Sequence, residues 1–223
     1  YYVPGSGVGQ AMQAAADLYG PAARIGVVGL GTGTLACYAR PGQHWRFFEI
    51  DPAVVRIARD TGQFHFLANC LPSPTIVIGD ARMRLTQQAP ASLDLLALDA
   101  FSSDAVPMHL MTREAFATYA RALSPRGLLL VHISNRFLDL EPVVAAAAAD
   151  GGWFAARLNY APGPGEGEHA TVSDWVALSR DRAALSRLTA RAGDWVPLEP
   201  RKGFQPWTDD YATILPLLRS LEP

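Results

Sequence analysis

The stretch VVGLGTGTLACYARPGQHWRFFEID, residues 27 to 51, decides the fold. It begins with an apolar run that predicts a strand and continues through a turn with three glycines, Gly29, Gly31 and Gly33. A second apolar run then ends in two acidic residues, Glu49 and Asp51. A glycine turn lets a nucleotide approach the unpaired N–H groups at the start of a helix. A carboxylate at the end of the next strand can accept hydrogen bonds from both ribose hydroxyls. The spacing therefore predicts a nucleotide site.

Short apolar runs alternate with amphipathic segments along most of the chain, which predicts parallel strands joined by helical crossovers. We expect a Rossmann-like α/β fold, with a seven-stranded, mostly parallel sheet, helices on both faces and an antiparallel final strand. Strands are predicted near 24–29, 44–50, 75–79, 93–99, 127–133, 153–159 and 172–179. Helices are predicted near 8–19, 33–39, 52–60, 111–123, 139–150, 181–191 and 209–220. The Pro- and Gly-rich segment 161–169 predicts the loop that reverses the last strand.

Composition narrows the classes of function. The 223 residues carry a formal net charge of −2, so one domain over residues 1–223 is expected and a nucleic-acid partner is not. No apolar run approaches the roughly 18 residues of a membrane span.

Cys37 and Cys70 lack metal-ligand spacing and are expected to be small buried hydrophobes without a disulfide, as suits a reducing cytoplasm. Because the chain begins at Tyr1 and not at Met, we expect a longer protein, in which a fused membrane segment is left open.

The type of nucleotide follows from the details of the turn. The dinucleotide fingerprint G-x-G-x-x-G would place its third glycine at Thr34, but Gly33 comes one residue early, which argues against NAD. Asp80, with Ala81 beside it, follows the third strand, where its carboxylate can accept a hydrogen bond from an adenine amino group. The three strand ends together predict an adenosine site.

The segments GLGTG, FEIDP, GDARM and LDAFSSDAVPMHLMTREAF resemble the spermidine synthase (polyamine aminopropyltransferase) family, within the S-adenosylmethionine-dependent methyltransferase fold. The resemblance covers residues 1 to 150 well and the remainder loosely. It implies that Glu49 holds the ribose of decarboxylated S-adenosylmethionine and that Asp80 meets its adenine. It also implies a substrate-pocket role for Gln10, which aligns with the glutamine of the family's Y-Q-E-M segment.

Aminopropyl transfer requires a neutral amine, and Asp99, at the end of the fourth strand, is the predicted base. The resemblance implies that Asp104 binds the polyamine, although it lies five residues after Asp99 where the family's D-x-S-D-P motif has three. The alternative is that Asp99 caps its strand and Asp104 starts a turn. Asp209 and Asp210, in PWTDDYA, are predicted either to N-cap a last helix or to attract a cationic substrate. His132 ends the fifth strand, as a proton carrier or as a histidine satisfied by a neighbour.

Two departures from the family leave the substrate open. Thr32 replaces the aspartate that binds the aminopropyl amine, and Gly9 replaces the tyrosine before the glutamine, for which Tyr1, Tyr2 or Tyr160 could substitute. Loss of the acidic residue makes intact S-adenosylmethionine more acceptable. The alternatives are therefore a small-molecule methyltransferase and a nucleoside-binding domain without catalysis. In each case the partner is a small molecule, an amine in the first hypothesis. No metal is expected, and a homodimer is left open.

Overall fold

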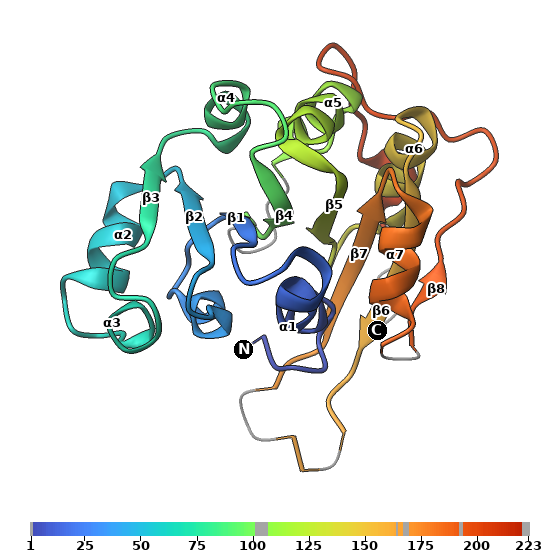
Figure 1. Ribbon diagram of the computed structural model, residues 1–223. Helices are drawn as coiled ribbons and strands as arrows, with labels where there is room; N and C mark the ends of the chain where they lie inside the picture. The colour runs from blue at the N-terminus through green and yellow to red at the C-terminus, as the bar shows by residue number, and fades with distance from the viewer. Residues whose placement is uncertain (1, 101–106, 164, 167–169, 192–193, 220–223) are drawn as a thin grey trace.

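One central sheet runs through the described residues 2–100, 107–163, 165–166, 170–191 and 194–219 of the computed structural model, as Figure 1 shows. The strand order is β3-β2-β1-β4-β5-β7-β6-β8. The strands are β1 (Arg24–Val28), β2 (His44–Glu49), β3 (Thr75–Ile78), β4 (Leu93–Leu98), β5 (Leu123–His132), β6 (Phe154–Tyr160), β7 (Ser173–Ser179) and β8 (Val196–Pro197). β1 to β5 pair in parallel, whereas the pairs β5–β7, β7–β6 and β6–β8 are antiparallel.

The predicted Rossmann-like, mostly parallel α/β sheet is confirmed, including the antiparallel β7. The described residues contain one strand more than the seven predicted, because Val196 and Pro197 pair with Arg157 and Ala156 of β6. A strand of two residues is too short to show a sequence period.

Helices cover both faces of the sheet and enclose two separate apolar cores. One face carries α1 (Gly7–Tyr19), the 3-10 turn η1 (Thr34–Tyr38), α2 (Pro52–Arg59), α3 (Phe66–Cys70) and α7 (Arg182–Thr189). The other carries α4 (Ala81–Thr86), α5 (Arg113–Ala122) and α6 (Glu141–Asp150), with the 3-10 turns η2 (Met108–Leu110) and η3 (Leu215–Leu217). No helix of the described part of the chain is both long and apolar enough to span a bilayer.

The helix predicted near 209–220 is wrong over its described residues, 209–219, where the only helical turn is η3. Thr208 and Tyr211 form a turn instead, each backbone N–H donating to the other's carbonyl at 2.9 and 3.2 Å. Trp207 is buried, and its indole N–H donates to the Thr213 carbonyl. Tertiary contacts of this kind override helix propensity.

The prediction of unpaired cysteines is also wrong. Cys37 of η1 and Cys70 of α3 form a disulfide, with their Cα atoms 4.7 Å apart. The packing of α3 against η1 brings them together, and a sequence separation of 33 residues gives no sign of it. Cys37 is exposed and not a buried hydrophobe. The expectation of a reducing cytoplasm therefore loses the support that it drew from these residues.

Replacing both Cys37 and Cys70 with serine should lower the free energy of unfolding by about 3 to 4 kcal/mol, because the disulfide closes a loop of more than 30 residues that contains β2 and α2. Urea unfolding of the oxidised protein and of the double variant measures the difference. Added reductant should destabilise the wild type and leave the variant unchanged. Equal midpoints with equal slopes would contradict a disulfide in the folded protein.

Candidate active site

The carboxyl ends of β1 to β4 meet at the point where the strand order changes direction, between β1 and β4. Open α/β sheets bind their ligands in the crevice at this point. A cavity of about 340 Å³ lies there. Six of the residues predicted from the sequence line it together, namely Gly29, Gly31, Glu49, Asp80, Ala81 and Asp99.

Gly29 and Gly31 shape the floor of this cavity, with positive φ angles of 91° and 52°. A Cβ atom on Gly29 would lie 2.3 Å from the Asp99 carbonyl oxygen, so only glycine lets β1 and β4 end so close together. A Cβ atom on Gly31 would meet nothing within 4 Å, which leaves the space above the turn open to a ligand. Gly33 does not line the cavity; it is the N-cap residue of η1 and packs against Leu67.

Glu49 is held in place by the backbone. The residue is 7% exposed, and its two carboxylate oxygens accept hydrogen bonds from the Leu30 N–H at 2.8 Å and the Asp51 N–H at 3.0 Å. A carboxylate has about four acceptor positions, so each oxygen can accept a further hydrogen bond from a ligand. Asp51 instead caps α2 by accepting from the Ala53 N–H, is exposed, and does not line the cavity.

Asp80 caps α4, because its Oδ1 accepts from the Met83 N–H at 2.9 Å. Its Oδ2 lies 2.8 Å from Nε2 of His109, which also lines the cavity. Partial burial opposes ionisation of the carboxyl group, but the hydrogen bonds from Met83 and His109 outweigh it and lower the pKa of Asp80 below its ordinary value. The site therefore presents an ionised carboxylate at neutral pH.

Asp99 follows β4 and is held by side chains from distant segments. Its Oδ1 accepts a hydrogen bond from the Tyr2 hydroxyl at 2.6 Å and lies 3.1 Å from Nδ1 of His132. Tyr2 thus reaches the predicted base, whereas the Tyr160 hydroxyl donates to Glu166, and Tyr1 lies outside the described residues. Tyr38 positions the N-terminal segment by donating to the Tyr2 carbonyl at 2.6 Å.

Gln10 is not brought to the cavity. Its Nε2 donates to the Gly5 carbonyl at 2.9 Å, and its Oε1 accepts from the Trp195 indole N–H at 2.7 Å. Both ends of the amide are therefore engaged, one within the N-terminal segment and the other in packing α1 against Trp195. Asp104 lies outside the described residues.

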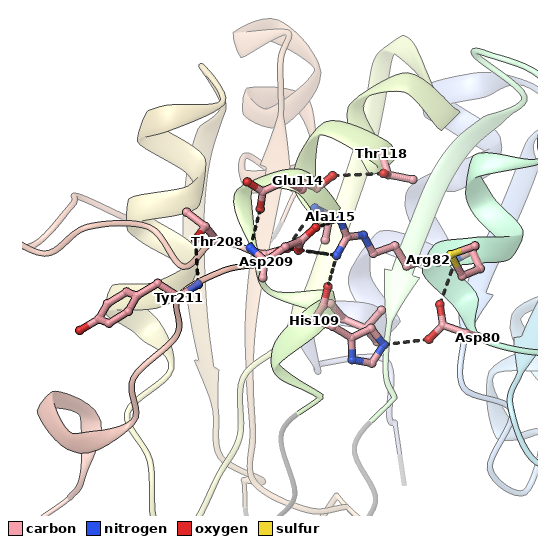
Figure 2. A network of polar contacts seen from close by, with 12 residues as sticks. Asp80, Arg82, His109, Glu114, Ala115, Thr118, Thr208, Asp209 and Tyr211 are labelled. Carbon is pink, nitrogen blue, oxygen red and sulfur yellow. Dashed lines mark hydrogen bonds and ion pairs between the residues drawn. The ribbon is translucent and has the colours of Figure 1, made fainter.

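Asp209 joins the C-terminal segment to α4 and α5, as Figure 2 shows. Its carboxylate receives two hydrogen bonds of 2.6 Å from the Arg82 guanidinium and one of 2.8 Å from the Thr112 hydroxyl. Arg82 also donates to the His109 carbonyl at 3.1 Å, so the network ends beside Asp80. Asp210 is exposed outside this network. Neither aspartate lines the cavity, and neither caps a helix.

Comparison with known proteins gives this geometry a context. A polyamine aminopropyltransferase of Vibrio vulnificus (strain CMCP6) is 32% identical over 179 residues, which are 78% of this chain and 58% of that protein. The chain resembles the polyamine aminopropyltransferases. It spans less than two thirds of the length of this curated relative. No family model matches the chain.

Solved structures show that the fold is shared with the aminopropyltransferases. A probable spermidine synthase from Corynebacterium glutamicum ATCC 13032 has a TM-score of 0.66 at 20% identity, over 93% of this chain and 80% of that one. A spermidine synthase in complex with the transition state analogue AdoDATO has a TM-score of 0.57 at 13% identity, over 90% of this chain and 67% of that one. The resemblance to the aminopropyltransferases predicted from the sequence is confirmed.

The contact between Asp209 and Arg82 predicts a pH dependence. The hydrogen bond from Arg82 lowers the pKa of Asp209 below its ordinary value, so the unfolded chain binds more protons than the native state near pH 4. The stabilisation is present above that pH and is lost as the pH falls through the native pKa. Asp209→Asn should therefore reduce the loss of unfolding free energy between about pH 5 and pH 2.

Urea unfolding at several pH values measures this slope. Asp210→Asn is the matched control, because it removes a neighbouring exposed carboxylate that has no hydrogen bond within the described residues. Identical slopes for the wild type and Asp209→Asn would refute the assigned role of the ion pair.

Proposed function

We propose that the chain is an aminopropyltransferase that moves an aminopropyl group from decarboxylated S-adenosylmethionine to a diamine. The main support for the proposal is the negative charge of the residues that line the cavity. Its described lining includes the carboxylates of Glu49, Asp80 and Asp99, and neither lysine nor arginine. A donor whose tail is cationic fits such a surface, whereas a donor with a carboxylate tail would be repelled.

The donor's nucleoside has a partner for each part. In this proposal the remaining acceptor positions of Glu49 bind the ribose hydroxyls, and Asp80 accepts from the adenine amino group. Ile50, Val54 and Leu110 line the same cavity and supply an apolar surface for the purine. When bound, the donor supplies a sulfonium whose neighbouring carbon is open to attack by a nucleophile.

Asp99 acts on the acceptor. The substrate ammonium gives one proton to the Asp99 carboxylate, and the neutral nitrogen then forms the new N–C bond while the C–S bond breaks with its electron pair to sulfur. The positive charge passes from sulfonium to the product's secondary ammonium, and the proton on Asp99 leaves to water. Oδ2 is the oxygen suited to this step, because Tyr2 and His132 both bind Oδ1.

The charge argument predicts the order of ligand affinities. Decarboxylated S-adenosylmethionine should bind more tightly than S-adenosylmethionine, because only the latter brings a carboxylate to an acidic cavity. Isothermal titration calorimetry with both donors and with methylthioadenosine measures this order. Glu49→Gln, which removes the proposed ribose partner, should weaken all three ligands by about 1 to 3 kcal/mol.

Equal or tighter binding of intact S-adenosylmethionine, together with methyl transfer, would replace this proposal with a methyltransferase. Unchanged binding of all three ligands by the Glu49→Gln variant would remove the nucleoside site as we assign it.

The role of Asp99 is tested by turnover. Asp99→Asn keeps the size of the side chain but removes the base, so turnover with a diamine should fall by about 10²- to 10⁴-fold. Affinity for methylthioadenosine should change little, because the nucleoside is assigned to Glu49 and Asp80. Coupled detection of methylthioadenosine release measures the rate. An Asp99→Asn variant as active as the wild type would exclude this mechanism.

A further inference from the structure

His132 has more partners than a strand-end histidine needs for packing. It is the last residue of β5 and pairs with Trp175 of β7 across the antiparallel ladder. The two rings stack with centroids 4.7 Å apart and planes 17° apart, and the Tyr2 ring meets both edge-on. The residue is 9% exposed. The plane of the imidazole is therefore fixed from both strands and from the N-terminal segment.

The hydrogen bonds of the ring specify its tautomer. An ionised Asp99 carboxylate can only accept, so Nδ1 of His132, 3.1 Å from Oδ1, carries the proton. In the neutral form of the ring Nε2 then accepts, and the Ser134 hydroxyl is 2.8 Å away. Ser134 Oγ itself accepts from the Asp174 N–H at 2.7 Å, which leaves its proton for Nε2. The network assigns the Nδ1–H tautomer.

We propose that His132, held in this tautomer by Ser134, is a positioning residue for Asp99. With Tyr2 it fixes Oδ1, and Oδ2 then has no hydrogen bond from any described residue and is the oxygen that meets the substrate ammonium. The effect on turnover rests on the proposed function, whereas the tautomer does not. A base held in one orientation spends less free energy on alignment when the substrate arrives.

The tautomer is tested without reference to activity. In the full chain labelled with ¹⁵N-histidine, the resonances of His132 are assigned by their absence from a His132→Gln variant. We expect a protonated Nδ1 and an unprotonated Nε2. Ser134→Ala and Asp99→Ala should each shift the ring toward the Nε2–H form. A protonated Nε2 on a neutral His132 in the wild type would overturn the proposal.

The positioning role is tested with two amides that both lose the stacking on Trp175. The Nδ2 atom of His132→Asn can occupy the place of Nδ1 and still donate to Asp99, whereas the amide of His132→Gln reaches toward the place of Nε2. We expect kcat to fall about 10- to 100-fold for His132→Gln, with KM for the donor unchanged, and to be largely restored in His132→Asn.

The results separate the two proposals. Equal losses in His132→Gln and His132→Asn, matched by equal losses of thermal stability, would reduce His132 to a packing residue and leave aminopropyl transfer intact. A wild type that transfers no aminopropyl group would refute the proposed function, and the histidine resonances would still decide whether His132 is held as the Nδ1–H tautomer beside Asp99.

Discussion

The site depends on the close approach of two chain segments at the ends of β1 and β4. The Gly29 N–H donates to the Phe48 carbonyl, and the Asp99 N–H donates to the Val28 carbonyl, each at 2.8 Å. These bonds continue the parallel ladder to its last residue. Any side chain at Gly29 would collide with the Asp99 backbone and separate the strands. The absence of one Cβ atom therefore sets the distance between the glycine turn and the predicted base.

The three carboxylates of the cavity are held in different ways. Backbone N–H groups bind Glu49 on both oxygens and Asp80 on one, so the positions of these two follow directly from the strand ends and from the start of α4. Asp99 is held by the side chains of Tyr2 and His132, 97 and 33 residues away in the sequence. A carboxylate held by side chains can be oriented without a change in the main chain. This is the arrangement expected of a base beside two fixed binding groups.

The sequence predicts the site residues whose positions depend only on the order of strands and turns along the chain. Glu49, Asp80 and Asp99 each follow an apolar run, and parallel strands bring such positions to one edge. Tyr2 was one of three tyrosines that could not be distinguished, because its partner Asp99 is 97 residues away in the sequence. Ser134 lies two residues after His132, but nothing in the sequence shows that the two side chains meet. The disulfide was not predicted, and a C-terminal helix was predicted wrongly, because both depend on packing between segments that are far apart in the sequence. Packing of η1 on α3 pairs the cysteines, and contacts with α4 and α5 hold Asp209.

The ion pair between Arg82 and Asp209 affects the charge beside the cavity. Arg82 follows Ala81, a lining residue, and a free guanidinium there would favour an anionic ligand. Asp209 instead binds the Arg82 guanidinium through both oxygens, and the hydrogen bond raises the pKa of Arg82 further above its ordinary value. Because the compensating carboxylate comes from the C-terminal segment and not from the cavity, Arg82 is paired without Glu49, Asp80 or Asp99. Asp209 therefore neutralises Arg82, and the described lining of the cavity stays acidic, as the proposed cationic donor requires.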